Sequence, residues 1–296
     1  MKNGVGFTRK QIGIISLILT TFFWGSTFFL VKETVSIIPL DGFLTVRFLF
    51  GGLILLPLNI QKVKFEKRLL GYSILLGTLL YGSFWFQTVG LTMTTPAKAA
   101  FITGLNVVFV PFLALLPPFR GRLRPIEIVV AMISLAGLGF LTLDFENLEI
   151  YVGDAIIVLT AIAVAFHVLF TEQARDLDPQ ALVMVQLFVV AFESLIVSIV
   201  RGTFWNPLQT LEVDRIVWIT LMVTAILATA FAFVSQTYAQ KAGVNSAHIA
   251  IIFALEPLFA LIIDIFRGVM PSPQALLGMA LILLANFWII RLEFRD

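Results

Sequence analysis

Ten apolar stretches, each long enough to cross a membrane as a helix, follow one another along this 296-residue chain. A crossing helix needs about 20 predominantly apolar residues. The stretches lie at 12–31, 41–60, 69–90, 97–117, 126–143, 154–172, 180–200, 215–236, 245–266 and 274–291. Because they do not alternate between polar and apolar residues as barrel strands do, we predict an all-α integral membrane protein with ten transmembrane helices.

The composition agrees with this prediction and excludes several other classes. Hydrophobic residues make up 59% of the chain and charged residues 13%, whereas soluble domains have about 45–50% and about 25%. A chain so poor in charge cannot cover itself with polar surface in water, which excludes an ordinary soluble enzyme. The chain has no cysteine, which excludes thiolate metal sites and a cysteine nucleophile. We expect no metal, no cofactor and no nucleic-acid partner.

The distribution of basic residues predicts the orientation. With the N-terminus placed in the cytoplasm, 14 of the 20 lysine and arginine residues fall on the cytoplasmic side and 5 outside, and Arg47 lies inside the second span. Cytoplasmic loops carry the excess of positive charge in membrane proteins. We therefore predict a multi-pass protein of the cell (inner) membrane with both termini in the cytoplasm. No signal-peptide cleavage site follows the first span, which we interpret as an uncleaved helix.

The sequence indicates an internal duplication, with an acidic external linker between the two copies. Residues 1–143 form the first five-helix repeat, 144–153 the linker and 154–296 the second repeat. Matching pairs are Thr27 with His167, Gln87 with Gln236, Pro111 with Pro257 and Pro125 with Pro273. Because five is odd, the second copy enters the membrane from the other side, and such inverted repeats are typical of secondary transporters.

Two of the paired prolines, Pro111 and Pro257, lie inside the fourth and ninth spans. A proline removes a backbone donor and loosens the helix around it. Paired interruptions of this kind indicate a binding site near the middle of the membrane. We predict that these two helices break there and take part in gating.

The motifs in this order resemble a known family. They are Trp24-Gly25-Ser26-Thr27 in the first span, Arg47-Phe48 in the second, Ala99 to Leu105 in the fourth and Leu255-Glu256-Pro257-Leu258-Phe259-Ala260 in the ninth. Together they resemble the drug/metabolite transporter superfamily, in its ten-helix EamA-like branch. The second copy departs from the pattern, with Val164 at the place of the tryptophan. The resemblance implies a polytopic inner-membrane carrier of small metabolites, often an exporter, with a central cavity between the halves.

Two charged residues inside the spans are candidates for function, because a charge in hydrocarbon is costly. Glu256 lies beside Pro257 and is a candidate for proton coupling or substrate contact. Its alternative role is a carboxylate tied to a neighbouring helix, for instance through Arg47. Arg47 could hold an anionic group of a substrate, but we favour a structural bridge to backbone or to a carboxylate.

A set of neutral polar and aromatic residues completes the candidate site. Its members are Trp24, Thr27, Tyr81, Gln87, Thr103, Asn106, His167 and Gln236. Such groups suit a zwitterionic or amphipathic metabolite, and their alternative role is hydrogen bonding between helices. The two histidines, His167 and His248, lie on different spans without the spacing of metal or haem ligands.

Three other polar positions have structural interpretations. Asp264 and Arg267 are spaced for an ion pair within one helix. Lys98 opens the fourth span, and we expect its side chain to extend to the membrane surface. Glu193 of the seventh span is expected to pack or to form an interhelical hydrogen bond.

The sequence therefore predicts a secondary transporter that moves a small organic metabolite by alternating access. We expect an amino acid or a related amphipathic solute, exported through a rocking motion about the Pro111 and Pro257 helices, with protons as a further partner. The lipid bilayer surrounds the chain, and a homodimer is left open. An intramembrane enzyme acting on a lipid or prenyl substrate is the alternative, but its usual motifs are missing. A channel would need rings of repeated ligands.

Overall fold

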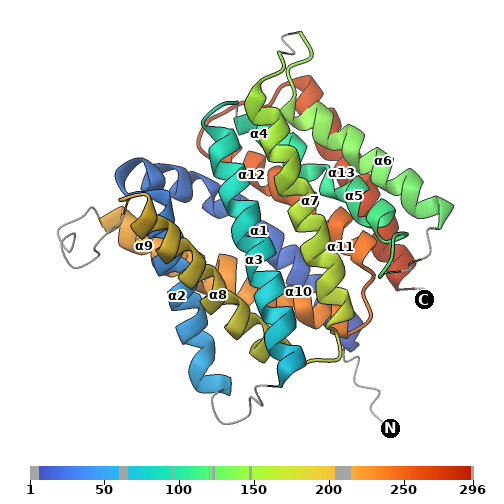
Figure 1. Ribbon diagram of the computed structural model, residues 1–296. Coiled ribbons are helices and arrows are strands. Elements are labelled where there is room, and N and C mark those ends of the chain that lie inside the picture. The colour runs from blue at the N-terminus through green and yellow to red at the C-terminus, as the bar shows by residue number, and fades with distance from the viewer. Residues whose placement is uncertain are drawn as a thin grey trace.

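The computed structural model describes residues 7–59, 66–94, 96–119, 121, 124–146, 149–203 and 215–294. All regular elements in these ranges are helices: α1 (Arg9–Ile37), α2 (Leu40–Asn59), α3 (Lys67–Leu91), α4 (Pro96–Gly104), α5 (Asn106–Leu113), α6 (Pro125–Thr142), α7 (Val152–Gln173), α8 (Pro179–Val200), α9 (Arg215–Ala225), the π-helix η2 (Ile226–Phe231), α10 (Ala232–Lys241), α11 (Ser246–Phe253), α12 (Leu255–Phe266) and α13 (Pro273–Glu293). Figure 1 shows them as one bundle. Two linker residues, Asn147 and Leu148, lie outside the described residues.

The helices match the predicted spans. Within the described ranges, eight helical runs are long and apolar enough to cross a membrane. A ninth is α1, which is bent by 45° between Arg9–Thr27 and Phe29–Ile37. The span predicted at 97–117 is the shorter, interrupted pair α4 and α5. The prediction of an all-α, duplicated membrane fold is confirmed.

Successive spans run in opposite directions, which gives the bundle two ends. The helices α1, α3, α6, α8 and α11 begin at one end, which we call the N-terminal face, and α2, α4, α7, α9 and α13 begin at the other, the opposite face. Contacts across the N-terminal face agree with this assignment. One is the ion pair of Lys10 with Glu293, at the start of α1 and the end of α13.

The fourth and ninth spans are both broken, at Leu105 and at Ala254. In the ninth span the cause is Pro257, because it cannot donate to the carbonyl of Phe253 four residues earlier. In the fourth span the break lies six residues before Pro111, and α5 continues through that proline. There the Asn106 side chain donates to the carbonyl of Thr103 (2.8 Å), three residues back.

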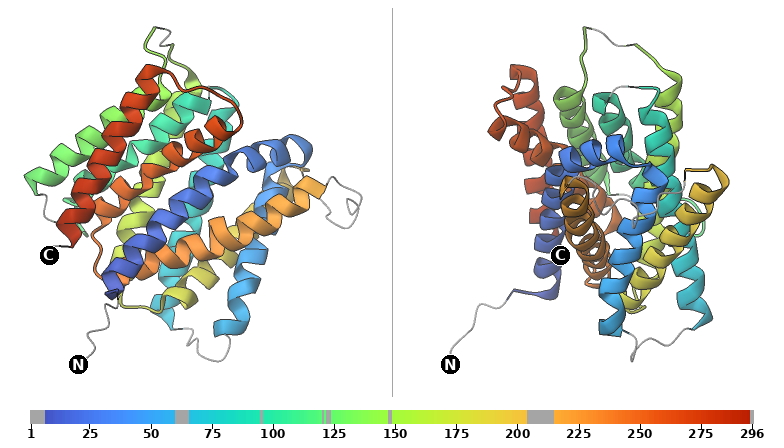
Figure 2. Two further views of the ribbon diagram at one scale, coloured as in Figure 1. Left: turned by 180° about the vertical axis from the view of Figure 1, so that it is seen from behind. Right: turned by 90° about the vertical axis from the view of Figure 1, so that its left-hand side faces the viewer.

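The contacts of the two halves correspond. α1 packs on α10 and α12, and its counterpart α7 packs on α3, α4 and α5. The second spans of the two halves, α2 and α8, pack on each other, and so do the fifth, α6 and α13. Figure 2 shows α6 and α13 side by side. They meet at Gly137 and Gly278, where a Cβ on Gly278 would lie 2.6 Å from the Gly137 oxygen.

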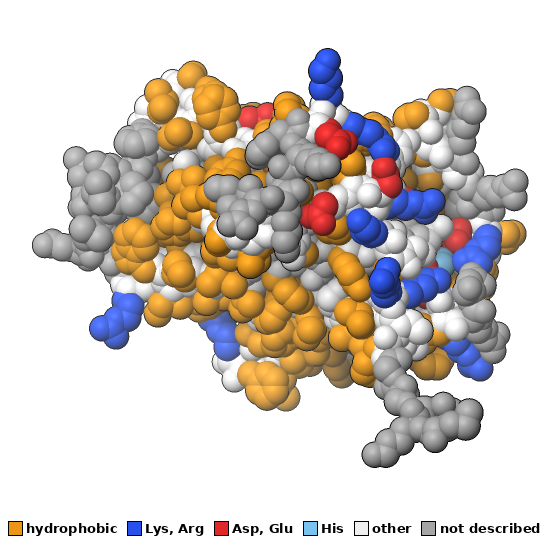
Figure 3. Space-filling view, turned by 90° about the horizontal axis from the view of Figure 1, so that it is seen from below, with side chains coloured by type: hydrophobic (Ala, Val, Ile, Leu, Met, Phe, Trp, Pro, Cys, Tyr) orange, Lys and Arg blue, Asp and Glu red, His pale blue; other side chains and the backbone are white. Residues whose placement is uncertain are grey.

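Two large apolar clusters and a smaller one around Leu76 and Leu182 form the core. One large cluster joins α1, α5, α6, α7 and α11 to α13, and the other joins α2 to α8 and α9. Large hydrophobic side chains also cover the outside, such as Leu276, Leu283 and Phe287 on α13. Seen from below, hydrophobic side chains cover the middle and left of the molecule, and most basic side chains gather on the right among acidic ones (Figure 3). An apolar outer surface of this kind suits a protein that is surrounded by the hydrocarbon of a bilayer.

Candidate functional site

The π-helix η2 supplies an acceptor in the middle of the eighth span. A π-turn bonds five residues back and leaves backbone groups without their usual α-helical partner, and such turns are frequent at functional sites. The carbonyl of Ala228 accepts from Trp24 Nε1 of α1 (2.9 Å) and from Arg47 Nη2 of α2 (3.1 Å). Three helices therefore converge on one carbonyl oxygen.

Arg47 is held by oxygens and aromatic rings. Its Nε donates to Thr229 Oγ1 (2.7 Å), and the residue is 5% exposed. Its guanidinium carbon lies 6.0, 5.5 and 5.4 Å from the ring centroids of Phe43, Phe48 and Phe84. Cation–π attraction lowers the cost of placing this charge in an apolar interior. The predicted bridge from Arg47 to backbone is present, through Ala228.

Glu256 lies in the first turn of α12, directly after the break at Ala254. The N-terminus of a helix favours a negative charge, here at a half-helix that begins inside the span. Arg47 is the charged group that acts on Glu256 electrostatically. Among the described ion pairs within 4 Å none joins these two residues, so the structure holds opposite charges near each other without a direct pair.

A second group of predicted residues lies between α3, α4 and α5. Gln87 Nε2 donates to Thr103 Oγ1 (3.3 Å), and Asn106 donates to the Thr103 carbonyl. The Oδ1 atom of Asn106 is buried and has no hydrogen-bond partner among the described residues. This group lies at the break of the fourth span, the counterpart of the break beside Glu256.

A third group joins the second half to Trp24. Gln236 Nε2 and His167 Nδ1 lie 3.5 Å apart. The ring of Phe233 has its centroid 5.7 Å from that of His167 and 6.0 Å from that of Trp24. The ring centroids of Phe253 and Trp24 lie 5.0 Å apart. The predicted residues His167 and Gln236 are therefore linked to Trp24 through the ring of Phe233.

Two predicted residues have other surroundings. The hydroxyl of Thr27 donates to the Phe23 carbonyl within α1 (2.7 Å). Tyr81 lies near Asp41 and Glu193, towards the opposite face, and its hydroxyl is buried without a hydrogen-bond partner among the described residues. Neither residue forms a described hydrogen bond with Arg47. Both therefore lie outside the central group, which consists of Trp24, Arg47, Ala228 and Thr229.

A charged network at the N-terminal face was not predicted. His248 pairs with Glu293 through Nδ1 and with Glu127 through Nε2 (3.2 Å). Glu127 also pairs with Arg124 (3.0 Å), and Glu293 with Lys10. The network ties together the ends of α1, α6, α11 and α13. His248 could not be paired with Glu127 from the sequence, because the two residues lie more than a hundred positions apart along the chain.

Removing His248 is expected to lower stability strongly. Replacement by alanine leaves the carboxylates of Glu127 and Glu293, each 2–3% exposed, without their shared partner, and breaking a buried pair costs about 3–5 kcal/mol. We expect a clear fall in the unfolding temperature of detergent-solubilised protein. The control is Asp176→Asn, whose pair with Arg68 is exposed to solvent and contributes little to stability. Equal unfolding temperatures for both variants would contradict this role.

Three structural interpretations can be compared with the contacts. The predicted ion pair of Asp264 with Arg267 is confirmed (3.3 Å), and Glu193 accepts the predicted interhelical hydrogen bond, from Thr78 (2.6 Å). The prediction for Lys98 is wrong. Its side chain is 12% exposed and lies 3.7 Å from Asp154 and 4.5 Å from the ring centroid of Tyr151, because the carboxylate and the aromatic face attract the ammonium group.

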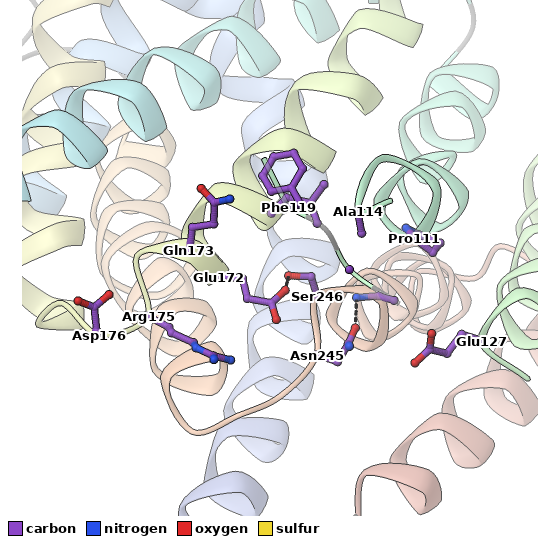
Figure 4. Close-up of a pocket in the computed structure, with 13 residues that line it drawn as sticks. Pro111, Ala114, Phe119, Glu127, Glu172, Gln173, Arg175, Asp176, Asn245 and Ser246 are labelled. Atoms are coloured by element: carbon purple, nitrogen blue, oxygen red, sulfur yellow. Dashed lines mark hydrogen bonds between the residues drawn. The ribbon is translucent and has the colours of Figure 1, made fainter. Parts of the chain in front are cut away.

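A pocket of about 350 Å³ opens between the N-terminal-face ends of α5 and α7 and the start of α11. Its lining is Pro111, Ala114, Phe119, Gly121, Glu127, Leu169, Glu172, Gln173, Arg175, Asp176, Asn245, Ser246 and Ala247. Figure 4 shows Glu172 and Ser246 pointing toward one another across it, and Ser246 donates to Glu172. The pocket is polar at its rim and apolar towards Pro111 and Leu169.

Comparisons with known proteins agree with the fold. A crystal structure with 17% sequence identity superposes with a TM-score of 0.80, over 96% of this chain and 98% of the other. An uncharacterized transporter of Archaeoglobus fulgidus is 28% identical over 286 residues, which cover 96% of this chain and 87% of that protein. An uncharacterized transporter of Acidianus ambivalens is 30% identical over 151 residues, covering 50% of this chain and 56% of that protein.

The family match extends over nearly the whole chain. The EamA-like transporter family matches residues 11–143 and again residues 151–291. The two matches cover both sets of five spans, and the motifs around Trp24 and Glu256 lie within them. This chain belongs to the EamA-like transporter family.

Proposed function

We propose that this transporter is a secondary carrier that exports a small zwitterionic metabolite, an amino acid or a related amphipathic solute, by alternating access. The observation that carries the proposal is the placement of Arg47 and Glu256. Opposite charges are held near each other inside the bundle without an ion pair between them. A solute with a carboxylate and an ammonium group complements both.

The surroundings of the two charges suit such a solute. Two N–H groups of Arg47 are used on Thr229 and Ala228, out of the five that a guanidinium carries. The carboxylate of the solute would accept from Arg47, and its ammonium group would donate to Glu256. The aromatic side chains of Trp24, Phe233 and Phe253 would pack against its apolar part.

The topology that we propose is compatible with export. Both termini lie in the cytoplasm of a cell with an inner membrane, because most basic residues then lie inside. The N-terminal face is then cytoplasmic, and the pocket between α5 and α7 opens toward the cytoplasm. An exported solute would enter there.

The test is counterflow in proteoliposomes with a panel of labelled amino acids, with and without a pH gradient. We expect saturable exchange in the native protein. We expect Glu256→Gln to retain exchange with a weaker apparent affinity, because the amide oxygen still accepts from the ammonium group without the charge. The exchange should lose its dependence on the pH gradient, because the amide cannot take up a proton.

The matched control is Glu193→Gln, on α8, where the carboxylate accepts from Thr78 outside the central group. It should leave the pH dependence unchanged. Flux that does not saturate would indicate a channel instead. Exchange of none of the amino acids would exclude the substrate class, and a pH response that survives Glu256→Gln would exclude Glu256 as the coupling site.

A further inference from the structure

We infer that the bent end of α1, Phe29–Ile37, is the gate on the opposite face, held closed by Arg267 on Phe29, and that the pocket on the N-terminal face is the open counterpart of this gate. The inference rests on the proposed alternating access. It follows from comparing each half of the molecule with the equivalent place in the other half.

Inverted repeats make this comparison informative. In such carriers the two halves exchange conformations when the site changes the face to which it opens. A contact that is made in one half and missing at the counterpart position in the other therefore marks a part that moves. A contact that is made in both halves is kept in both states and marks a pivot.

The pocket and the Arg267 contact occupy counterpart positions. A shift of 146 residues relates the fourth span to the ninth and carries Pro111 and Ala114, which line the pocket, to Pro257 and Ala260. The sequence Phe-Arg-Gly follows both spans, at 119–121 and at 266–268, so Arg267 stands at the end of the ninth span that corresponds to the pocket-lining Gly121 region. A shift of 140 residues relates the first span to the sixth and carries Phe29 to Leu169, which also lines the pocket.

On the opposite face these counterpart positions are packed together. The guanidinium carbon of Arg267 lies 3.6 Å from the ring centroid of Phe29. A Cβ on Gly25 of α1 would lie 2.8 Å from the backbone nitrogen of Ala260. Phe22 and Phe259 have ring centroids 5.5 Å apart. The space that is a pocket of about 350 Å³ between α5 and α7 is closed between α12 and α1.

The two helices that flank these places differ in shape. α1 bends by 45° before Phe29, whereas its counterpart α7 is one continuous helix from Val152 to Gln173. Figure 2 shows the end of α1 turning away from the line of the helix. Phe29, directly after the bend, contacts Arg267, whereas α7 lines the open pocket with Leu169, Glu172 and Gln173.

The other ends of these helix pairs are held by ion pairs in both halves, through different residues, and act as pivots. At the opposite face, Lys98 at the start of α4 pairs with Asp154 at the start of α7. At the N-terminal face, the counterpart helix starts are joined through Glu293, which pairs with Lys10 of α1 and His248 of α11. The α4–α7 and α1–α11 pairs are therefore fixed at one end, and each opens at its other end in turn.

The chain has no cysteine, so single cysteines can report each face without background. The matched probes are Ala114→Cys in the pocket and Ala260→Cys at its closed counterpart, labelled with a maleimide in detergent-solubilised protein without substrate, where the reagent reaches both faces. In the native background we expect Ala114→Cys to react and Ala260→Cys to be protected. Phe29→Leu should then lower labelling of Ala114→Cys and raise that of Ala260→Cys, by about two- to five-fold for an exposed cation–π contact.

Two variants serve as controls. Phe29→Tyr keeps a ring under Arg267 and should leave both labelling rates unchanged. Asp264→Asn removes the ion pair within α12 but not the ring contact, and it should also change neither rate. If Phe29→Leu fails to fold, Arg267→Gln removes the same contact from the other side.

Three results would overturn the inference. They are an unreactive Ala114→Cys in the native background, labelling rates that Phe29→Leu and Arg267→Gln leave unchanged, and an equal response to Asp264→Asn. Because labelling needs no substrate, these results are independent of counterflow. A labelling shift without amino-acid exchange would keep the gate and exclude the proposed substrate, whereas exchange without a labelling shift would exclude the gate.

Discussion

Gly25→Ala is expected to lower both the unfolding temperature and the transport rate of this protein. The added Cβ would lie 2.5 Å from the Glu256 oxygen, 2.8 Å from the Ala260 nitrogen and 2.9 Å from the Phe259 Cβ. Two of these atoms belong to the backbone of α12, so no side-chain rotation relieves the clash. The two helices must separate, and overpacking of this kind costs about 1–3 kcal/mol. The displaced segment of α12 carries Glu256, which couples the clash to the site.

The matched control for this prediction is Gly71→Ala in α3. A Cβ on Gly71 meets no atom within 4 Å, and alanine favours a helix over glycine by about 0.8–1 kcal/mol. We expect this variant to be as stable as the native protein or more so, with native counterflow. Thermal unfolding in detergent and counterflow in proteoliposomes measure the two effects. Equal behaviour of the two variants would show that the close approach of α1 to α12 is not required.

Hydropathy was sufficient to predict the spans, because the bilayer itself sets their length. The fourth span could not be predicted in the same way. The pair α4 and α5 crosses with a break at Leu105, which Pro111 does not explain. There the side chain of Asn106 donates to the Thr103 carbonyl in place of a backbone N–H group. A proline can be read from the sequence. A side chain that replaces a backbone bond depends on the local fold and could not be predicted.

The candidate site was predicted in its residue types but not in its grouping. Arg47 was correctly given a backbone partner, yet the acceptor, Ala228, has no side-chain signal and is available because η2 is a π-helix. His248 looked like a lone histidine, although its carboxylate partners come from α6 and α13. Lys98 pairs inward with Asp154. In each case the missing information is a contact between helices far apart in the chain.

Arg47→Met is expected to abolish most transport while leaving the fold intact. Methionine keeps much of the length of the side chain among Phe43, Phe48 and Phe84, and replacing a buried ionic group by an apolar one of similar size is often neutral for stability. Transport should respond differently, because a carboxylate in the site would lose its positive partner. Losing one partner of a buried charged contact costs about 2–5 kcal/mol, which lowers apparent affinity by about 30-fold or more.

Two further variants separate charge from hydrogen bonding at Arg47. Arg47→Lys keeps the charge but loses the planar fork that reaches Thr229 and Ala228 together, and it should retain part of the transport. Thr229→Val removes one acceptor and leaves the charge, and it should have the smallest effect. Unfolding temperatures and counterflow would be measured for all three. If Arg47→Met unfolds early while Arg47→Lys transports normally, Arg47 is a structural bridge. If Arg47→Met is stable and transports normally, the carboxylate of the solute does not bind at Arg47.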